Sequence, residues 1–276
     1  MKKLFAILIM ATLTTTTEAQ SAGKYATVNG LKMYYEIHGN GNPLVLIHGG
    51  GSTIESNWGR ILPTLAKTHR VIAVEMQAHG HTEDRDQPLS FTQDADDVAE
   101  LLNQLKVTKA DIFGFSNGAS TTLEIAIRHP ELVNRIVVAS TMYKKAGAYP
   151  WFWDVMKDAT FEQMPQGLKD AFLKINPDKD ALYTMYKRDV TRMQNFTDIR
   201  EEDIKGIKAP ALIIVANQDV CTPEHGVEML RQMQHASLLV LPGGHGDYIG
   251  EITTVKPGVV EYPAVKLIEQ FLQEGK

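Results

Sequence analysis

The stretch Gly114-Phe115-Ser116-Asn117-Gly118 is the strongest structural signal in this chain, because its flanks match its pattern. The run Asp111-Ile112-Phe113 precedes it, and residues 119–128 follow with apolar side chains at helical spacing. Strand, Gly-x-Ser-x-Gly and helix in this order form a nucleophile elbow, a tight, strained turn that exposes a serine hydroxyl. Its two glycines remove side chains that would clash. The pattern predicts that Ser116 is a nucleophile, with an ordinary glycine-rich turn as the alternative.

Short apolar runs alternate with helical patterns on both sides of the elbow. Such runs are typical of strands buried on both faces of a parallel sheet. An Asn29-Gly30 turn between two strand-like segments predicts an N-terminal β-hairpin. The alternation predicts an α/β fold with a mostly parallel, doubly wound sheet. The predicted buried strands lie at residues 44–47, 71–74, 135–140, 211–215 and 238–241, and the predicted helices at residues 58–66 and 95–105 and after Pro223 and Pro263.

The alternation stops between residues 141 and 206, where the sequence becomes helical, aromatic and rich in methionine. An insertion between two core strands predicts a helical cap over the strand ends, where α/β sheets carry their sites. The expected organisation is therefore a core of residues 24–140 and 207–276 with an inserted cap of residues 141–206. Some cap side chains should line an apolar pocket. The candidates for this pocket are Trp151, Phe152 and Trp153.

A serine hydroxyl is a weak nucleophile unless a histidine accepts its proton and a carboxylate orients that histidine. Behind an elbow the acid and then the histidine follow along the chain, each in a loop after a strand. Asp219 and His245 meet this condition and are predicted as acid and base. Asp247 and Glu224 are the competing carboxylates. The first lies too close to His245 in sequence to orient its ring, and the second lies within a predicted helix.

The tetrahedral intermediate of acyl transfer needs amide donors for its oxyanion. His48-Gly49-Gly50-Gly51 follows the first core strand, and its glycines allow backbone N–H groups to approach a ligand. We expect one donor to be the Gly50 amide, with Gly51 as the neighbouring possibility, and the second to be the Asn117 amide. A P-loop fits these glycines poorly, because no Gly-Lys-Ser/Thr follows them. His48 is predicted to be structural.

The other residues with reactive side chains predict no further site. His79-Gly80-His81 suggests a metal pair, but its i, i+2 spacing without a third ligand favours a glycine-containing turn. Cys221 is the single cysteine, so no intramolecular disulfide is expected, and a small buried side chain is the favoured reading. No metal, nucleotide or organic cofactor is expected.

Composition sets the remaining bounds. A chain of 276 residues with 43% hydrophobic residues suits one large α/β domain. Its net charge of −5, with acids and bases interspersed, gives no basic surface for nucleic acid.

Lys2-Lys3 and the apolar run Leu4 to Leu13 predict a signal peptide, residues 1–19, cleaved after Ala19. A buried N-terminal helix is the alternative. The prediction is an exported protein, periplasmic or secreted, with no membrane anchor after cleavage.

With these motifs in place, the chain resembles the α/β-hydrolase superfamily from about Lys24 onward. The resemblance rests on the glycine turn at 48–51, the elbow, the acid loop Asp219-Val220-Cys221-Thr222-Pro223 and Gly244-His245. It implies a Ser116–His245–Asp219 triad. Many members have an Asp and an Arg-Gly-His-Gly turn where this chain has Glu75 and Gln77-Ala78-His79-Gly80, which places a structural hydrogen-bond pattern in doubt.

The resemblance also narrows the expected activity. Serine at the elbow argues against epoxide hydrolases and haloalkane dehalogenases, which use aspartate. Phe115 and Asn117 depart from the Gly-Gly-Ser-Trp-Gly of proline iminopeptidases. Cleavage of carboxylic esters of small to medium apolar substrates is the favoured activity. A lactonase, a carbon–carbon bond hydrolase, an iminopeptidase-like amidase and an inactive ligand-binding homologue are the alternatives. A small ester-like molecule is the expected partner, and the oligomeric state is not indicated.

Overall fold

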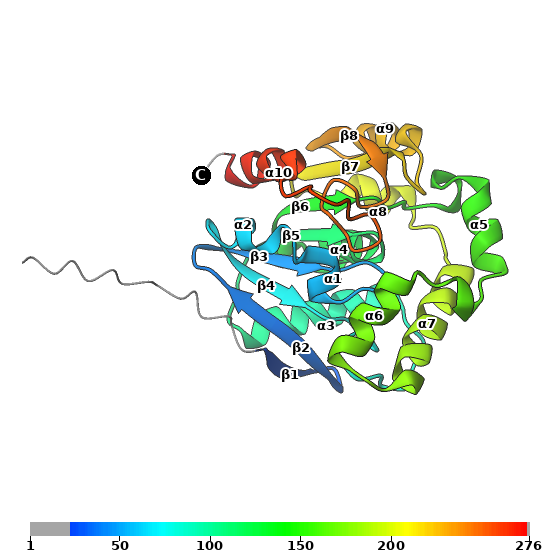
Figure 1. Cartoon of the computed structure of the whole chain (residues 1–276). Coiled ribbons are helices and arrows are strands. Elements are labelled where there is room, and N and C mark those ends of the chain that lie inside the picture. The colour runs from blue at the N-terminus through cyan, green and yellow to red at the C-terminus, as the bar shows by residue number, and fades with distance from the viewer. Residues whose placement is uncertain (1–22, 275–276) are drawn as a thin grey trace, which may run out of the picture.

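Within residues 23–274, the part of the chain that it describes, the computed structural model contains an eight-stranded sheet (Figure 1). Its strands are β1 (Lys24–Val28), β2 (Leu31–His38), β3 (Asn42–Ile47), β4 (His69–Val74), β5 (Ala110–Phe115), β6 (Val133–Ala139), β7 (Ala211–Gln218) and β8 (Ala236–Gly244). They run across the sheet in the order β1-β2-β4-β3-β5-β6-β7-β8. The β1–β2 and β2–β4 pairs are antiparallel, and the other pairs are parallel.

Helices cover both faces of the sheet, and side chains of β3 alternate between them. Leu44 and Leu46 belong to a buried cluster with one set of helices, while Val45 and Ile47 belong to the cluster on the other face. The predicted fold class, a mostly parallel sheet with helices on both sides, is confirmed.

The helices are α1 (Ile54–Trp58), α2 (Leu62–Leu65), α3 (Phe91–Gln104), α4 (Asn117–Arg128), α5 (Pro150–Lys157), α6 (Gln166–Ile175), α7 (Lys179–Gln194), α8 (Glu201–Gly206), α9 (Pro223–Gln232) and α10 (Pro263–Gln273), with 3₁₀ turns η1 (Pro130–Leu132), η2 (Lys145–Gly147) and η3 (Phe161–Gln163).

The N-terminal hairpin and most helices lie where the sequence predicts them. Asn29 and Gly30 have φ of 46° and 81°, as a two-residue hairpin turn requires. The single helix expected over residues 58–66 is wrong, because this region forms α1 and α2 instead. Gly59 is the C-cap of α1, and Pro63 can occupy the first turn of a helix but not its interior.

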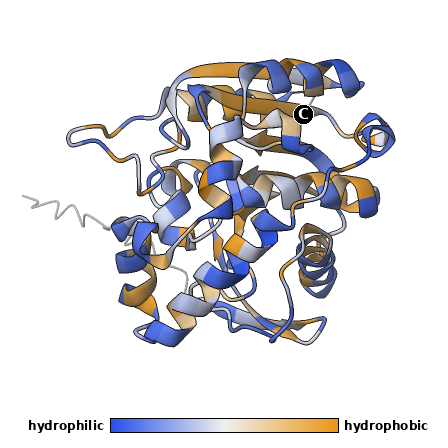
Figure 2. Ribbon diagram, turned by 90° about the vertical axis from the view of Figure 1, so that its right-hand side faces the viewer, coloured by the Kyte–Doolittle hydropathy of each residue, from blue (hydrophilic) through white to orange (hydrophobic). Residues whose placement is uncertain are grey.

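The chain leaves the sheet after β6 and returns to it at β7. The intervening helices α5, α6 and α7 lie together on one side of the molecule, at the right of Figure 1. Figure 2 looks onto this side, where hydrophilic and hydrophobic residues alternate along the helices. α8 contacts α4 and α9, and its Ile204 is fully buried in the core. The inserted segment therefore ends in a helix that packs on the core, and the cap boundaries at 141 and 206 stay a prediction.

The N-terminal prediction falls outside this description. Residues 1–19, the expected signal peptide, are not among the described residues. Among residues 23–274, no helix combines the length and apolarity needed to cross a membrane.

Candidate active site

Ser116 lies in a strained turn between β5 and α4. Its φ of 54° and ψ of −121° fall outside the regions that residues with a side chain favour. Gly114 and Gly118 are needed there: a Cβ atom on Gly114 would lie 2.1 Å from the Gly118 oxygen, and one on Gly118 would lie 2.1 Å from the Ile47 oxygen. The chain therefore adopts the expected elbow, with Ser116 at the N-terminus of α4.

The structure brings the three predicted catalytic side chains together. Asp219 directly follows β7 and His245 directly follows β8, so both lie at the strand ends beside Ser116. His245 Nε2 is 3.0 Å from Ser116 Oγ, and His245 Nδ1 is 2.6 Å from Asp219 Oδ1. With the Nδ1 hydrogen donated to Asp219, Nε2 is left to accept the serine proton.

The electrostatics of His245 and Asp219 favour a proton on His245 Nδ1 and an ionised Asp219. Burial on its own lowers the pKa of His245, but the adjacent Asp219 carboxylate outweighs it and raises the pKa above its usual value. For Asp219 the two effects have opposite signs. Burial raises the pKa of this carboxyl, but His245 and the surrounding hydrogen-bond donors lower it by more, so the net shift is downward. Asp219 therefore stays ionised and stabilises the imidazolium that forms when His245 accepts a proton.

Ser140, which the sequence interpretation missed, holds the second oxygen of Asp219. Its hydroxyl donates to Asp219 Oδ2 and lies 2.6 Å from the Tyr248 hydroxyl. The backbone N–H groups of Val220 and Ala216 donate to the same carboxylate, at 2.7 and 3.3 Å. A signal existed in the sequence, because Ser140 directly follows β6, the strand that pairs in parallel with the elbow strand β5.

Asp247 does not compete for His245. Its Oδ2 accepts the N–H of Gly244 at 2.8 Å and lies 3.4 Å from Lys256 Nζ. The carboxylate therefore holds the backbone of its own loop, and among the described residues Asp219 is the carboxylate hydrogen bonded to the His245 ring.

We expect Ser140→Ala to lower kcat about tenfold, since a hydrogen bond to a charged group contributes about 1.5–3 kcal/mol. Without this donor the Asp219 carboxylate becomes more basic and holds the protonated form of His245 more firmly. The acid limb of kcat/KM should therefore move to higher pH, which a pH–rate profile measures. Ser120→Ala is the matched control, because Ser120 is a buried serine whose hydroxyl pairs with Thr141 at 2.8 Å. An unchanged kcat and pH profile in Ser140→Ala would contradict this role.

The glycine turn lies directly against the nucleophile. A Cβ atom on Gly49 would lie 3.2 Å from Ser116 Cβ. The Gly49 N–H donates to Asn57 Oδ1 at 2.8 Å. The Gly51 N–H donates to Asp189 Oδ2 at 2.7 Å and lies 3.2 Å from His79 Nε2. Its amide is thus already engaged, which favours Gly50 over Gly51 as the oxyanion donor.

The other two expected donors keep free amides. Within residues 23–274, the N–H groups of Gly50 and Asn117 donate no hydrogen bond. Gly50 lies beside Asn117, since a Cβ atom on it would be 2.6 Å from Asn117 Nδ2. Two unpaired N–H groups next to a nucleophile suit the oxygen of a tetrahedral intermediate, so Gly50 and Asn117 remain the predicted oxyanion donors.

The histidines outside the triad have separate partners. His48 Nε2 accepts the Met76 N–H at 3.1 Å, and burial lowers the pKa of His48 to about 3, so this ring is neutral and structural. His79 pairs with Asp189 at 2.8 Å, whereas His81 pairs with Glu75 at 2.9 Å. In the described part of the chain, no group of three or more His, Cys, Asp or Glu side chains is arranged to hold a metal ion.

Cys221 is buried in an apolar cluster beside the acid loop. Burial raises the pKa of its thiol well above the usual value, with a further contribution from the Asp219 charge. The thiol therefore stays protonated, in keeping with a structural side chain.

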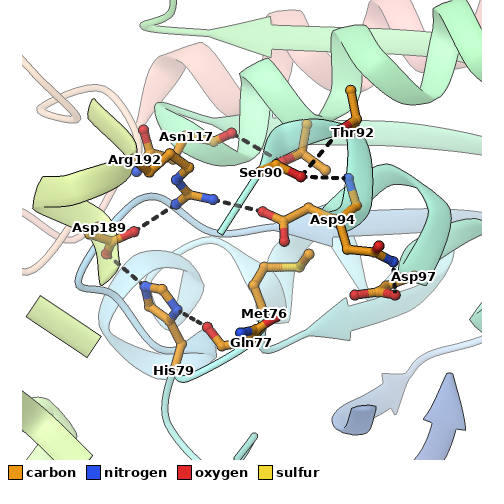
Figure 3. A network of polar contacts seen from close by, with 12 residues as sticks. Met76, Gln77, His79, Ser90, Thr92, Asp94, Asp97, Asn117, Asp189 and Arg192 are labelled. Carbon is orange, nitrogen blue, oxygen red and sulfur yellow. Dashed lines mark hydrogen bonds and ion pairs between the residues drawn. The ribbon is translucent and has the colours of Figure 1, made fainter. Parts of the chain in front are cut away.

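A row of buried and partly buried charges joins α7 to the core (Figure 3). Asp189 pairs with His79 and, through its other oxygen, with Arg192 Nη2 at 2.6 Å. Arg192 Nη1 donates to Asp94 Oδ2 at 2.7 Å. The sequence interpretation missed this row, because Asp189 and Arg192 sit in a helix with many charged residues and no motif.

The predicted pocket aromatics lie away from these contacts. Trp151 is 51% exposed. Trp153 packs on Phe196, with ring centroids 5.4 Å apart, and donates its Nε1 hydrogen to the Lys145 oxygen. Phe152 packs between the two tryptophans. Among the described contacts none joins these three rings to Ser116 or to the glycine turn, so their role as pocket residues stays a prediction.

Two other cap side chains reach the glycine turn. A Cβ atom on Gly51 would lie 3.3 Å from Leu168 Cδ1 and 3.4 Å from Met164 Cε. Leu168 is in α6, and Met164 follows η3. Apolar cap atoms therefore border the expected oxyanion site.

A cavity of about 570 Å³ lies between α3, α4 and α7. Its lining includes Phe91, Ser120 and Phe196 but neither Ser116 nor His245. Ser120 is one helical turn beyond Ser116, so the cavity approaches the nucleophile without including it.

Comparison with known proteins identifies the family to which the chain belongs. The sequence profile described as alpha/beta hydrolase fold matches residues 42–184, which is more than half of the chain. The chain belongs to this family.

Several relatives carry names that mention hydrolysis. The chain is 37% identical over 120 residues to 2-hydroxymuconate semialdehyde hydrolase of Pseudomonas sp. (strain CF600), a match covering 42% of each chain. It is 26% identical over 238 residues to the human protein named serine hydrolase BPHL, covering 79% of this chain and 77% of that protein. The chain spans less than half the length of the first curated relatives it matches.

Among solved structures, the enol-lactonase from Burkholderia xenovorans LB400 is similar, with a TM-score of 0.72 and 24% identity. The match covers 91% of this chain and 100% of that one. At this identity the likeness concerns the fold.

Proposed function

We propose that this hydrolase cleaves carboxylic ester bonds of small to medium apolar substrates through an acyl-enzyme on Ser116. The observation that carries the proposal is the hydrogen-bonded series from Ser116 Oγ through His245 to Asp219, with two free amides beside it. A base poised on a strained serine, with an ionised acid behind it, is the arrangement that acyl transfer requires.

The chemistry follows from these positions. His245 Nε2 accepts the Ser116 proton as Oγ attacks the ester carbonyl carbon. The carbonyl oxygen becomes negative and accepts hydrogen bonds from the amides of Gly50 and Asn117. The tetrahedral intermediate then collapses, its C–O bond breaks, and His245 gives the proton to the leaving alcohol. Water, deprotonated by His245, attacks the acyl-enzyme in the same way and releases the acid, restoring Ser116.

The surroundings favour an uncharged acyl group. Met164 and Leu168 place apolar atoms against the glycine turn. Arg192 is already neutralised by Asp94 and Asp189, so it is not free to pair with a substrate carboxylate. These contacts support an apolar ester over a charged substrate.

Cleavage of a lactone or of a carbon–carbon bond is the second candidate. It is favoured by the similarity to the Pseudomonas semialdehyde hydrolase and by the likeness to the enol-lactonase. The same serine, base and amides can serve any of these acyl transfers, and also an amidase.

A substrate panel with the purified protein tests the proposal. It would contain p-nitrophenyl acetate, butyrate and octanoate, a lactone, a vinylogous diketone and an aminoacyl amide, each assayed with the wild type and Ser116→Ala. We expect Ser116-dependent turnover of the esters with the highest kcat/KM. Faster cleavage of the diketone or the lactone would establish the second candidate. If a fluorophosphonate probe failed to label Ser116, the protein would be an inactive binding homologue.

We expect Leu168→Ala to favour long acyl chains. Removing three carbon atoms beside Gly51 should raise kcat/KM for the octanoate relative to the acetate about tenfold, the scale of a methylene or two in an apolar pocket. Val155→Ala is the control, because Val155 is 49% exposed on α5. Trp151→Ala and Trp153→Ala belong in the same series, since a shift there would support the sequence-based pocket. An equal change for all chain lengths in Leu168→Ala would mean that this side chain only holds the cap together.

We also propose that the protein is exported and that its signal peptide is removed. Lys2-Lys3 and the apolar run 4–13 favour a mature protein that begins near Gln20 outside the cytoplasm. N-terminal sequencing of the protein from its native host is the measurement. A chain that begins at Met1 or Lys2 would contradict export by cleavage.

A further inference from the structure

A carboxylate from the inserted helical segment binds the backbone of the glycine turn. Asp189, in α7, accepts the Gly51 N–H at 2.7 Å, although the two residues are 138 positions apart. A Cβ atom on Gly50 would lie 3.2 Å from the same carboxylate oxygen. Asp189 therefore binds Gly51 and lies beside Gly50, whose amide is predicted to bind the oxyanion.

Asp189 is itself held on two sides. His79 Nε2 is 2.8 Å from its Oδ2, and Arg192 Nη2 donates to its Oδ1 at 2.6 Å (Figure 3). His79 Nδ1 is 2.8 Å from the Gln77 oxygen, which fixes the ring. Burial alone would raise the pKa of Asp189, but His79 and Arg192 lower it below its usual value, so the carboxylate is ionised. An ionised carboxylate held in one orientation is a strong, directional acceptor for an amide.

The glycine turn depends on such external acceptors. Three consecutive glycines have little conformational preference, and Gly51 has a φ of 69°. Gly49 is tied to Asn57 of α1, and Gly51 is tied to Asp189 of α7. The Gly50 amide lies between these two anchors, one from the core and one from the inserted segment.

We propose that Asp189 is a positioning residue for the oxyanion site, and that this site is complete only while α7 lies against the glycine turn. The inference rests on the proposed function, because it assigns Asp189 an effect on the reaction at Ser116. Asp189 acts through Gly51, whose fixed amide sets the direction of the neighbouring Gly50 N–H. A substrate that keeps α7 in place therefore also keeps its own oxyanion site assembled.

Asp189→Ala is the direct test, and its buried surroundings can tolerate it. Arg192 keeps Asp94 as its partner. Burial lowers the pKa of His79 and Asp189 raises it, so loss of the carboxylate lowers this pKa and favours the neutral ring. With p-nitrophenyl acetate we expect kcat to fall 10–100-fold while KM stays within threefold, because removing an oxyanion donor altogether costs about 10²–10³-fold in kcat. The Ki of phenylboronic acid, whose adduct with Ser116 places an oxygen in the oxyanion site, should rise by a similar factor.

Arg188→Gln is the matched control. Arg188 precedes Asp189 in α7 and pairs with Asp84 at 2.6 Å and Asp86 at 3.0 Å, so its loss removes an anchor of α7 without touching the turn. Its kcat and KM should each stay within threefold of the wild type. Equal losses in Arg188→Gln and Asp189→Ala would mean that general anchoring of the helix is what matters, and would overturn the inference.

A second variant covers the case in which Asp189→Ala does not fold. Asp189→Asn keeps the shape, but it cannot present an oxygen to both Gly51 and Arg192, so the same loss of kcat is expected. A folded variant with unchanged kcat, or with a raised KM alone, overturns the positioning role while leaving Ser116-dependent turnover of the wild type intact. A wild-type protein without such turnover overturns the proposed function itself, and the inference with it.

Discussion

Ser116→Ala is expected to lower kcat for p-nitrophenyl acetate by about 10⁴–10⁶-fold, the scale on which a triad nucleophile contributes. The hydroxyl is the group that attacks the carbonyl carbon, and 3.0 Å separates it from the base that activates it. Steady-state kinetics at high enzyme concentration, together with loss of fluorophosphonate labelling, are the measurements.

The fold should be unaffected, because alanine keeps the Cβ atom and the substitution removes only the hydrogen bond between Ser116 Oγ and His245. An unchanged circular dichroism spectrum and melting temperature are the control. Activity within tenfold of the wild type would contradict the serine mechanism.

Asp219→Asn should lower kcat on the order of 10⁴-fold. The amide cannot stabilise the imidazolium, and its NH₂ group favours the His245 tautomer that cannot accept the serine proton. The pH dependence should change as well. Asp219 raises the pKa of His245, whereas burial lowers it. Loss of the carboxylate therefore lowers this pKa, and the acid limb of kcat/KM should move to lower pH.

Asp247→Asn serves as the control for the acid assignment. Asp247 lies in the same loop as His245 but accepts the Gly244 N–H instead. Its substitution should change kcat far less than Asp219→Asn and leave the acid limb in place. If Asp247→Asn proved the more damaging change, Asp219 would not be the acid.

The fold was predictable because its signals are local. Strands such as β3 and β4 are short apolar runs, and the elbow carries its glycines within five residues. The error at residues 58–66 came from weighing apolar spacing above two breakers, Gly59 and Pro63, which were visible in the sequence. The glycine cap and the proline end one helix and begin the next.

The site could be predicted where reactive residues directly follow a strand. Ser116, Asp219 and His245 each come directly after a strand, and parallel strands bring such residues to one edge. Gly50 and Gly51 are equivalent in sequence, and they differ only because an acceptor 138 residues away engages one of them.

Long-range polar partners could not be read from the chain. Ser140 is 79 residues from Asp219, and although its place after β6 puts it near the site, that place alone does not identify it as a donor to the acid. Asp189 and Arg192 resemble charges on a solvated helix face until the fold buries them. Pairing of this kind depends on how α7 packs, which periodicity alone does not determine.

The positive φ of Ser116 has a consequence for the evolution and engineering of the protein. A residue with a side chain in this conformation costs about 1–3 kcal/mol, a sizeable part of the roughly 5–15 kcal/mol by which most domains are stable. Glycine would relieve the strain, and its greater freedom in the unfolded chain would offset about 0.4–1 kcal/mol of that gain. A library selected for heat resistance, without regard to turnover, would therefore tend to discard the nucleophile in favour of glycine. Thermostabilisation of this protein therefore needs a screen for the proposed activity in every round.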